Sequence, residues 1–298
     1  MTIVEWCGII NNQSDYSRGS YAMSDETLNS TINKIGFTSS DLQEYLSQKA
    51  LKHRNYRHYS KCDRIQGILD TGYIYLNNGQ KWNDIIDREN FQNNISGKTN
   101  FGLCLTYSMS ESIAFWMLYS RFEGRMINFT RQIIEDIINT SRIVNIGQFK
   151  NEGFIVFQEY ELNTGEIFIS DIIYYDTDLK HPNEYRINHS DEKREYVDKA
   201  IIDNLDFIKK TNAWSYEKEC RLIIQLPNEI IERIKKNPKY EPSESISAQI
   251  KISDNLIPQL KERVIESPNT NNTEYTPSTL RNKIDWNVCC GCDLKKKG

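Results

Sequence analysis

The sequence has few of the features that mark a nucleic-acid-binding, membrane or secreted protein. Its 298 residues include 37 basic and 41 acidic side chains, which gives a formal net charge of −4. Because there is no overall excess of positive charge, the composition gives no support to a general nucleic-acid-binding protein, although it leaves room for a local basic groove. No stretch approaches the roughly 18 consecutive apolar residues of a membrane-spanning helix, so we expect no membrane segment.

The cysteines do not form a disulfide framework. There are seven, an odd number, and they are scattered along the chain except for Cys289, Cys290 and Cys292. This distribution fits a reducing compartment best. The first residues also include Glu5, an acid where a secretion signal carries basic residues. We therefore expect a soluble cytoplasmic protein.

Metal-ligand spacing is also missing. Structural zinc sites use four ligands in two spaced pairs, and the C-C-x-C group at 289–292 lacks a second pair. His181 and His189 are not spaced as ligands to each other or to any other histidine or cysteine. We therefore predict no metal site.

Three common nucleotide and hydrolase motifs are missing as well. The chain contains no G-x-x-x-x-G-K-[ST], no G-x-G-x-x-G and no G-x-S-x-G. P-loop nucleotide hydrolysis, a standard Rossmann site and the nucleophile elbow of the α/β-hydrolases therefore have no support.

The composition is that of a globular protein, with 38% hydrophobic and 26% charged residues, and the chain is long enough to bury a core. Strand and helix patterns are interleaved without the regular spacing of a doubly wound sheet, which favours a mixed α+β fold. We divide the chain into an N-terminal extension at 1–50, one domain at 51–285, and a tail rich in cysteine and lysine at 286–298.

Individual elements are predicted from periodicity and from capping residues. Ser39 or Ser40 is expected to cap a helix that continues to residue 51. Ser108 or Ser110 is expected to cap an apolar helix that is buried on nearly all sides. The other main predictions are strands at 56–60, 73–76, 101–107, 124–129 and 153–160, a short helix at 62–69, a polar loop at 176–192 and a helix from 195.

The most distinctive stretch is W-S-Y-E-K-E-C-R, residues 214–221. Its alternation of apolar and polar residues predicts a β-strand with one face on a core. Successive side chains of a strand point to opposite faces, so Glu217 and Glu219 would share the polar face. Arg221 lies on the same face, where an exposed ion pair with Glu219 would contribute little to stability. This stretch alone leaves a structural and a functional role open.

Several segments together resemble a bacterial family of domains of unknown function. They are Y-R-H-Y-S at 56–60, C-L-T-Y-S at 104–108, S-I-A-F-W-M-L-Y-S at 112–120, and F-I-K-K-T-N-A-W-S-Y-E-K-E-C-R-L-I at 207–223. The pattern W-x-Y-E-x-E-x-R is the most specific part of this likeness. More distantly, the order of histidine strand, short helix with glycine, aromatic helix and glutamate strand resembles the ADP-ribosyltransferase superfamily.

The superfamily resemblance implies a mixed, split β-sheet with flanking helices, NAD as the substrate, and Glu219 as the catalytic glutamate. Glu217 would complete an E-x-E pair. Breaking the bond between nicotinamide and ribose builds positive charge on the sugar, as glycosidases also do. A fixed carboxylate beside the ribose would stabilise that charge, and Glu217 would orient or deprotonate the acceptor.

The same resemblance implies which side chains bind NAD. His58 would hold the nicotinamide riboside, or Arg57 would take this first-strand role, and Tyr119 or Tyr107 would stack on the nicotinamide. The second motif of the superfamily corresponds to T-Y-S at 106–108 of this chain, where part of the superfamily has S-T-S. The full expected set is Arg57, His58, Tyr59, Tyr107, Ser108, Trp116 and Tyr119.

Partners follow from the class of enzyme alone. The acceptor would be a macromolecule, either a protein or a nucleic acid. A bacterial toxin or phage-defence effector of this class would also have an antitoxin protein that restrains it.

Two other functions also fit the sequence. One is a metal-dependent nuclease that places Asp84, Asp87, Glu217 and Glu219 around Mg²⁺. The other is a non-enzymatic binding module in which the aromatic residues form a core and the glutamates face solvent. A structure in which Glu219 faces open solvent would favour the binding module.

Overall fold

The computed structural model describes residues 32, 36–93, 97–110, 112–120, 124–151, 153–188 and 195–267. Helices and strands alternate irregularly along these residues, which confirms the predicted α+β class. No helix in this part of the chain is long and apolar enough to cross a membrane. Most of the predicted extension and the whole cysteine- and lysine-rich tail lie outside the described residues, and the domain division stays a prediction.

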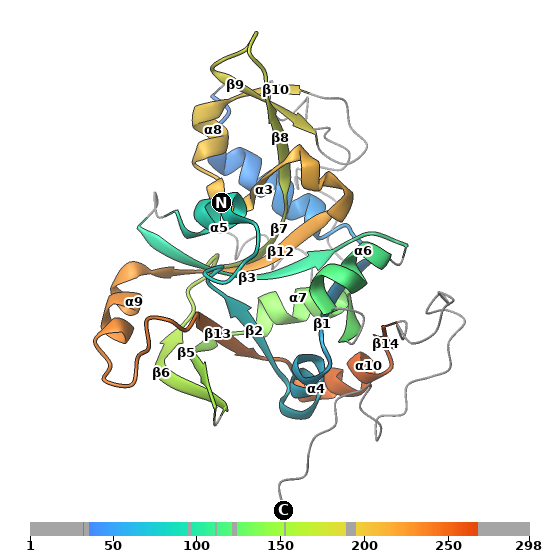
Figure 1. Cartoon of the computed structure of the whole chain (residues 1–298), viewed down its shortest axis with the longest axis vertical. Coiled ribbons are helices and arrows are strands. Elements are labelled where there is room, and N and C mark those ends of the chain that lie inside the picture. Colours follow the sequence, from blue (N-terminus) through green and yellow to red (C-terminus); the bar gives the residue numbers. More distant parts are fainter. Residues whose placement is uncertain are drawn as a thin grey trace, which may run out of the picture.

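Most described strands belong to one ten-stranded antiparallel sheet (Figure 1). Eight of them follow the path β14 (Val264–Glu266), β4 (Gly124–Thr130), β1 (Asn55–Lys61), β3 (Lys98–Thr106), β2 (Tyr73–Asn77), β13 (Ile246–Lys251), β5 (Ile143–Lys150) and β6 (Gly153–Glu161). The other two branch from β3, which pairs along its whole length with β12 (Glu219–Pro227), and β12 pairs in turn with β7 (Ile167–Asp171).

Two neighbours of β3 in the large sheet each pair with it at a single residue pair. β1 pairs with β3 only at Arg57 and Thr106, and β2 pairs with β3 only at Asn77 and Gly102. β1 instead pairs over its full length with β4. The separation of β1 from β3 leaves space beside the C-terminal end of β3, where the candidate site lies.

A second sheet has the order β10 (Glu195–Asp198), β9 (Glu184–Asn188), β8 (Ile173–Thr177) and β11 (Lys209–Thr211). In Figure 1, β8, β9 and β10 lie at one end of the molecule, beyond β7 and α3. The polar loop predicted at 176–192 is wrong at Glu184–Asn188, which forms β9. The helix predicted from 195 is wrong at its start, because Glu195–Asp198 forms β10. The buried side chains Ile187 and Val197 explain both strands, because each packs into the core on one face of its short strand.

Helices cover both sheets. The α-helices are α3 (Ser39–Ala50), α4 (Cys62–Thr71), α5 (Ile85–Gln92), α6 (Ile113–Phe115), α7 (Arg131–Thr140), α8 (Lys199–Asp203), α9 (Asn228–Lys235) and α10 (Ile257–Lys261). The π-helix η1 (Trp116–Ser120) follows α6 directly, and three 3-10 helices are η2 (Asp206–Ile208), η3 (Asn212–Glu217) and η4 (Asp254–Leu256).

Local sequence explains the ends of α3 and α4. The cap of α3 is Thr38 and not Ser39 or Ser40, because Thr38 and Asp41 exchange hydrogen bonds in a capping box. α4 ends at Thr71 and is capped by Gly72, whose φ of 70° is a left-handed conformation that glycine adopts without steric cost.

Two large cores and one small aromatic cluster hold the fold together. The first core lies between the large sheet and α4, α7 and α9. The second core joins α3 to β7 and to the second sheet. Leu42, Tyr45 and Leu46 of α3 are fully or nearly buried in it. The small cluster contains Tyr59, Phe115, Trp116 and Met126 and lies next to the candidate site.

Candidate functional site

Glu217 and Glu219 lie on either side of a sharp turn. η3 ends at Glu217, Lys218 has a left-handed backbone with φ 44° and ψ 54°, and β12 starts at Glu219. The carbonyl of Lys218 accepts a hydrogen bond from the backbone N–H of Tyr107 at 3.0 Å, which ties the turn to the end of β3. The prediction of one strand over 214–221 is therefore wrong for its first half, because a period-two pattern does not reveal a 3-10 turn.

A buried lysine lies between the two glutamates. Lys210 Nζ is 2.6 Å from Glu217 Oε2 and 2.8 Å from Glu219 Oε2. It is also 3.5 Å from Asp87 Oδ2. All four side chains are buried. The alternative in which the glutamates face solvent is therefore not the arrangement found, since both carboxylates face a buried cation.

Arg221 fixes the other side of Glu219. Its Nε donates to Glu219 Oε1 at 2.7 Å, and its Nη2 reaches both oxygens of Asp87 at 2.7 Å. The Trp82 and Phe91 rings lie 4.6 and 5.4 Å from the guanidinium carbon. The ion pair between Glu219 and Arg221 is thus buried and not exposed, and Arg221 holds the Glu219 carboxylate in one orientation.

The surrounding charges separate the pKa values of the two glutamates. Burial would raise the pKa of Glu219, but Arg221 and Lys210 outweigh this effect and hold the pKa well below its usual range. Burial and the charge of Glu219 raise the pKa of Glu217. Burial would lower the pKa of Lys210, but the carboxylates around it raise the pKa overall. Glu219 and Lys210 are therefore charged, and of the two glutamates Glu217 takes up a proton more readily.

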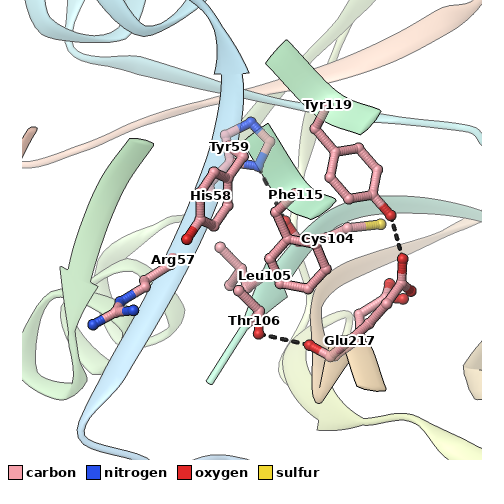
Figure 2. A pocket seen from close by; sticks show the side chains of 10 residues that line it. Arg57, His58, Tyr59, Cys104, Leu105, Thr106, Phe115, Tyr119 and Glu217 are labelled. Carbon is pink, nitrogen blue, oxygen red and sulfur yellow. Dashed lines mark hydrogen bonds between the residues drawn. The ribbon is translucent and has the colours of Figure 1, made fainter. Parts of the chain in front are cut away.

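Glu217 and Glu219 line a pocket whose empty volume, including its open mouth, is about 360 Å³. Three of its residues form a row across neighbouring strands, because Thr106 is the register partner of both Arg57 and Glu219. Directly paired residues share one face of an antiparallel sheet. The pocket is lined by Arg57, His58, Tyr59, Cys104, Leu105, Thr106, Phe115, Tyr119, Glu217 and Glu219 (Figure 2).

His58 lies where β1 and β3 separate. Its Nδ1 is 3.0 Å from the carbonyl oxygen of Cys104 on β3, and this contact makes Nδ1 the donor (Figure 2). Burial lowers the pKa of His58, so the ring is neutral and its Nε2 carries a free lone pair. The imidazole can therefore accept a hydrogen bond from a ligand hydroxyl.

Arg57 lines the side of the pocket opposite Glu217, and its guanidinium points away from the other labelled side chains (Figure 2). Its Nη2 donates to the carbonyl of Met109 at 2.9 Å. Its Nε and Nη1 are buried and have no hydrogen-bond partner among the described residues. Unsatisfied buried donors are costly, and two on one guanidinium suit a bidentate anion such as a phosphate or carboxylate.

The aromatic helix, formed by α6 and η1, lies over the pocket. Ser112, and not Ser108 or Ser110, caps it by accepting a hydrogen bond from the N–H of Phe115. Phe115 and Trp116 pack edge-on against Tyr59, with ring centres 5.3 and 4.7 Å away. The prediction of a helix buried nearly all round is wrong, because its outer face is exposed at Ile113, Met117, Leu118 and Tyr119.

The structure distinguishes the two tyrosines that were expected to stack on a ligand. Tyr119 lines the pocket, and its hydroxyl donates a short hydrogen bond to Glu217 Oε1 (Figure 2). Tyr107 does not line the pocket. Its ring stacks on His53, with centres 3.8 Å apart and planes 9° from parallel. One face of Tyr107 is thus already covered.

Six of the nine expected site residues line the one pocket: Arg57, His58, Tyr59, Tyr119, Glu217 and Glu219. The other three lie close by and have structural contacts. Tyr107 packs on His53, Trp116 is fully buried against Tyr59, and the backbone N–H of Ser108 donates to Thr106 Oγ1.

Sequence reasoning missed several residues of the site. Lys210 bridges the glutamates, and Thr106 donates from its hydroxyl to the Glu217 carbonyl at 2.6 Å. Cys104 and Phe115 line the pocket. The Lys209–Lys210 pair was visible just before the motif, but only the fold shows that Lys210 turns inward.

The four acids of the nuclease alternative are not arranged around a shared ion. Asp84 caps α5 by accepting from the backbone N–H groups of Ile86 and Asp87. Asp87 is bound by Arg221, and Lys210 lies where a cation between the carboxylates would lie. No group of three or more histidine, cysteine, aspartate or glutamate side chains in the described ranges is placed to hold a metal ion.

No family model, no curated protein and no solved structure matches this chain. The site is therefore interpreted from its geometry. Glu219 does not face open solvent, since it is only 4% exposed and lines the same pocket as His58 and Tyr119. The arrangement that would have favoured a non-enzymatic binding module is not the one found.

Proposed function

We propose that this chain is an NAD-dependent ADP-ribosyltransferase that transfers ADP-ribose from NAD to a macromolecule. One observation carries the proposal. Side chains from four separate segments, β1, β3, the aromatic helix and the Glu217–Glu219 turn, converge on a single pocket. The pocket has a neutral imidazole, an aromatic wall and a charged carboxylate, which can hold a nicotinamide riboside and stabilise the charge that develops on its ribose.

The ionised carboxylate is the centre of the chemistry. The bond between nicotinamide and ribose breaks with its electron pair moving to the nicotinamide nitrogen, so nicotinamide leaves as a neutral molecule and positive charge develops at C1′. Both oxygens of Glu219 already accept one hydrogen bond each, from Arg221 and Lys210. A carboxylate has about four acceptor positions, so Glu219 can still bind a ribose hydroxyl and stabilise the developing charge.

The pocket walls account for substrate orientation. The pocket is small and open at its mouth, so it suits one end of a dinucleotide while the rest extends outward. Tyr119 and Phe115 provide aromatic surface for the nicotinamide. His58 Nε2 can accept from a ribose hydroxyl, and the unsatisfied donors of Arg57 suit the pyrophosphate.

Glu217 is suited to take the proton of the acceptor. Its pKa is raised, mainly by burial, so it is a stronger base than an exposed glutamate. The acceptor nucleophile would form a bond to C1′ and pass its proton to Glu217, which balances the loss of nicotinamide. The acceptor is a protein, DNA or RNA, and a role as a toxin or phage-defence effector restrained by an antitoxin protein is part of the same proposal.

The test is incubation of the full chain with NAD labelled in the adenylate phosphate, together with bacterial lysate. We expect release of nicotinamide and transfer of label to macromolecules. Glu219→Gln should lower both by at least about a hundredfold, as loss of a group that stabilises transition-state charge does. Glu232→Gln is the matched control, because Glu232 lies exposed on α9 and should leave both rates unchanged.

Treating the labelled products separately with protease, DNase and RNase identifies the class of acceptor. The proposal is wrong if the wild-type chain releases no nicotinamide and transfers no label. It is also wrong if Glu219→Gln retains full activity.

A further inference from the structure

Two adjacent lysines in β11 have different partners. Lys209 forms ion pairs with Asp203 and Asp206, away from the pocket. Lys210 lies between Glu217 and Glu219. Both lysines are 5% exposed. Burial of a lysine is unfavourable unless its charge is compensated, so each belongs to a defined charge cluster.

The cluster around Lys210 has more carboxylates than cations. Asp87, Glu217 and Glu219 face Lys210 and Arg221, and all five side chains are buried. Arg221 forms ion pairs with Asp87 and Glu219, and among the described residues it forms none with Glu217. Lys210 is therefore the only cation within 4 Å of the Glu217 carboxylate among the described residues.

Lys210 also sets the relative position of the two glutamates. Its Nζ binds Oε2 of each, so these two oxygens are held next to each other despite their like charge. Like charges at short range favour protonation of one partner, and an ammonium between them opposes that tendency.

The second sheet holds Lys210 in place. Lys210 pairs with Tyr174 in the parallel ladder between β11 and β8. The Tyr174 hydroxyl accepts a hydrogen bond from the Glu219 backbone N–H at 2.8 Å. The ring of Trp214, which belongs to η3, lies 5.2 Å from Lys210 Nζ. The sheet that does not line the pocket thus fixes both the bridging lysine and the start of β12.

We propose that Lys210 is a positioning residue that holds the carboxylates of Glu217 and Glu219 side by side and in their charged form, so that both are available to the pocket. It acts through the glutamates and does not line the pocket itself. The consequence for activity rests on the proposed function, whereas the consequence for Glu217 ionisation does not.

The first test compares the pH dependence of nicotinamide release in Lys210→Met and Lys209→Met. Loss of the positive charge next to Glu217 should shift the acid limb of kcat to higher pH by about one unit or more. At neutral pH, kcat should fall at least about tenfold, while KM for NAD changes less than about threefold. Lys209→Met removes an equally buried charge and should leave the acid limb unchanged.

The second test needs no activity. Titration of the Glu217 side-chain carboxyl by ¹³C NMR should show a higher pKa in Lys210→Met than in the wild type. Lys210→Arg, which keeps the charge, should not raise it. If Lys210→Met does not fold, Lys210→Gln replaces it, and the comparison with Lys210→Arg still isolates the charge.

The two proposals fail in different ways. An inactive wild type with a shifted Glu217 titration would contradict the ADP-ribosyltransferase and leave the role of Lys210 standing. A Glu217 titration that is the same in wild type and in the folded neutral variant would overturn the role of Lys210. So would a Lys210→Arg variant whose Glu217 pKa rises as much as in the neutral variant.

Discussion

The Tyr119 hydroxyl donates a hydrogen bond to Glu217, a residue 98 positions further along the chain. Tyr119 is 44% exposed, whereas Glu217 is 2% exposed. This contact therefore joins the aromatic helix to the buried charge cluster. Burial and the Glu217 charge raise the pKa of Tyr119, so the phenol keeps its proton and remains the donor.

Tyr119→Phe should therefore lower activity without unfolding the protein. The ring stays in place, but Glu217 loses a donor that lowers its pKa. We expect kcat/KM for nicotinamide release to fall about tenfold, as for a lost hydrogen bond to a charged group. Tyr216→Phe is the control, because Tyr216 is also exposed but does not line the pocket. Equal effects of the two substitutions would contradict this role of Tyr119.

Arg221→Met should destabilise the fold strongly. It leaves Asp87 and Glu219 buried with one fewer cation, and removal of one partner from a buried ion pair costs about 3–5 kcal/mol. Urea unfolding followed by circular dichroism measures this loss. Lys235→Met on α9 breaks an exposed pair with Glu232 and should cost less than about 1 kcal/mol. A loss for Arg221→Met as small as that for Lys235→Met would show that the buried cluster does not stabilise the fold.

Glu219 should make the stability depend on pH. Its folded-state pKa is depressed, so its contribution is present at neutral pH, above the unfolded-state pKa of about 4.3. That contribution is lost as pH falls below this value, because the unfolded state then binds the proton first. The wild type should exceed Glu219→Gln in unfolding free energy by more at pH 7 than at pH 3.5. A difference that grows as the pH falls would contradict the assigned charge state.

Lys218 should tolerate glycine but not a β-branched residue. Its φ of 44° is the only positive value among the non-glycine residues of the described chain. Left-handed backbone costs about 1–2 kcal/mol for residues with a Cβ, and glycine avoids this cost but is more flexible when unfolded. Lys218→Gly should change the unfolding free energy by less than about 1 kcal/mol, whereas Lys218→Val should reduce it clearly. Equal stability of the two variants would show that the turn carries no strain.

Sequence periodicity predicted the strands that surround the pocket because they alternate clearly. β1 contains the predicted range 56–60, and β3 contains the predicted range 101–107 except for Tyr107; their pairing places His58 beside Cys104. β5 was not predicted, since the polar Gln148 is buried while the apolar Ile143 and Phe149 are exposed, which hides the alternation. Strand patterns therefore identified the frame of the site more reliably than its edges.

The side-chain partners of the site depend on tertiary packing. Nothing in the Lys209–Lys210 pair distinguishes the lysine that bridges the glutamates from the one that does not. Likewise, Tyr107 and Tyr119 were equivalent candidates until packing placed Tyr107 on His53. The turn at Lys218 also required the fold, because alternation predicted a continuous strand there.

The most direct test of the central claim is a crystal structure of the Glu219→Gln variant with NAD. The account predicts nicotinamide riboside in the pocket, with the nicotinamide against Tyr119 and a ribose hydroxyl within hydrogen-bond distance of residue 219. The pyrophosphate should contact Arg57. NAD bound at another site, or a pocket that stays empty at saturating NAD, would contradict the account.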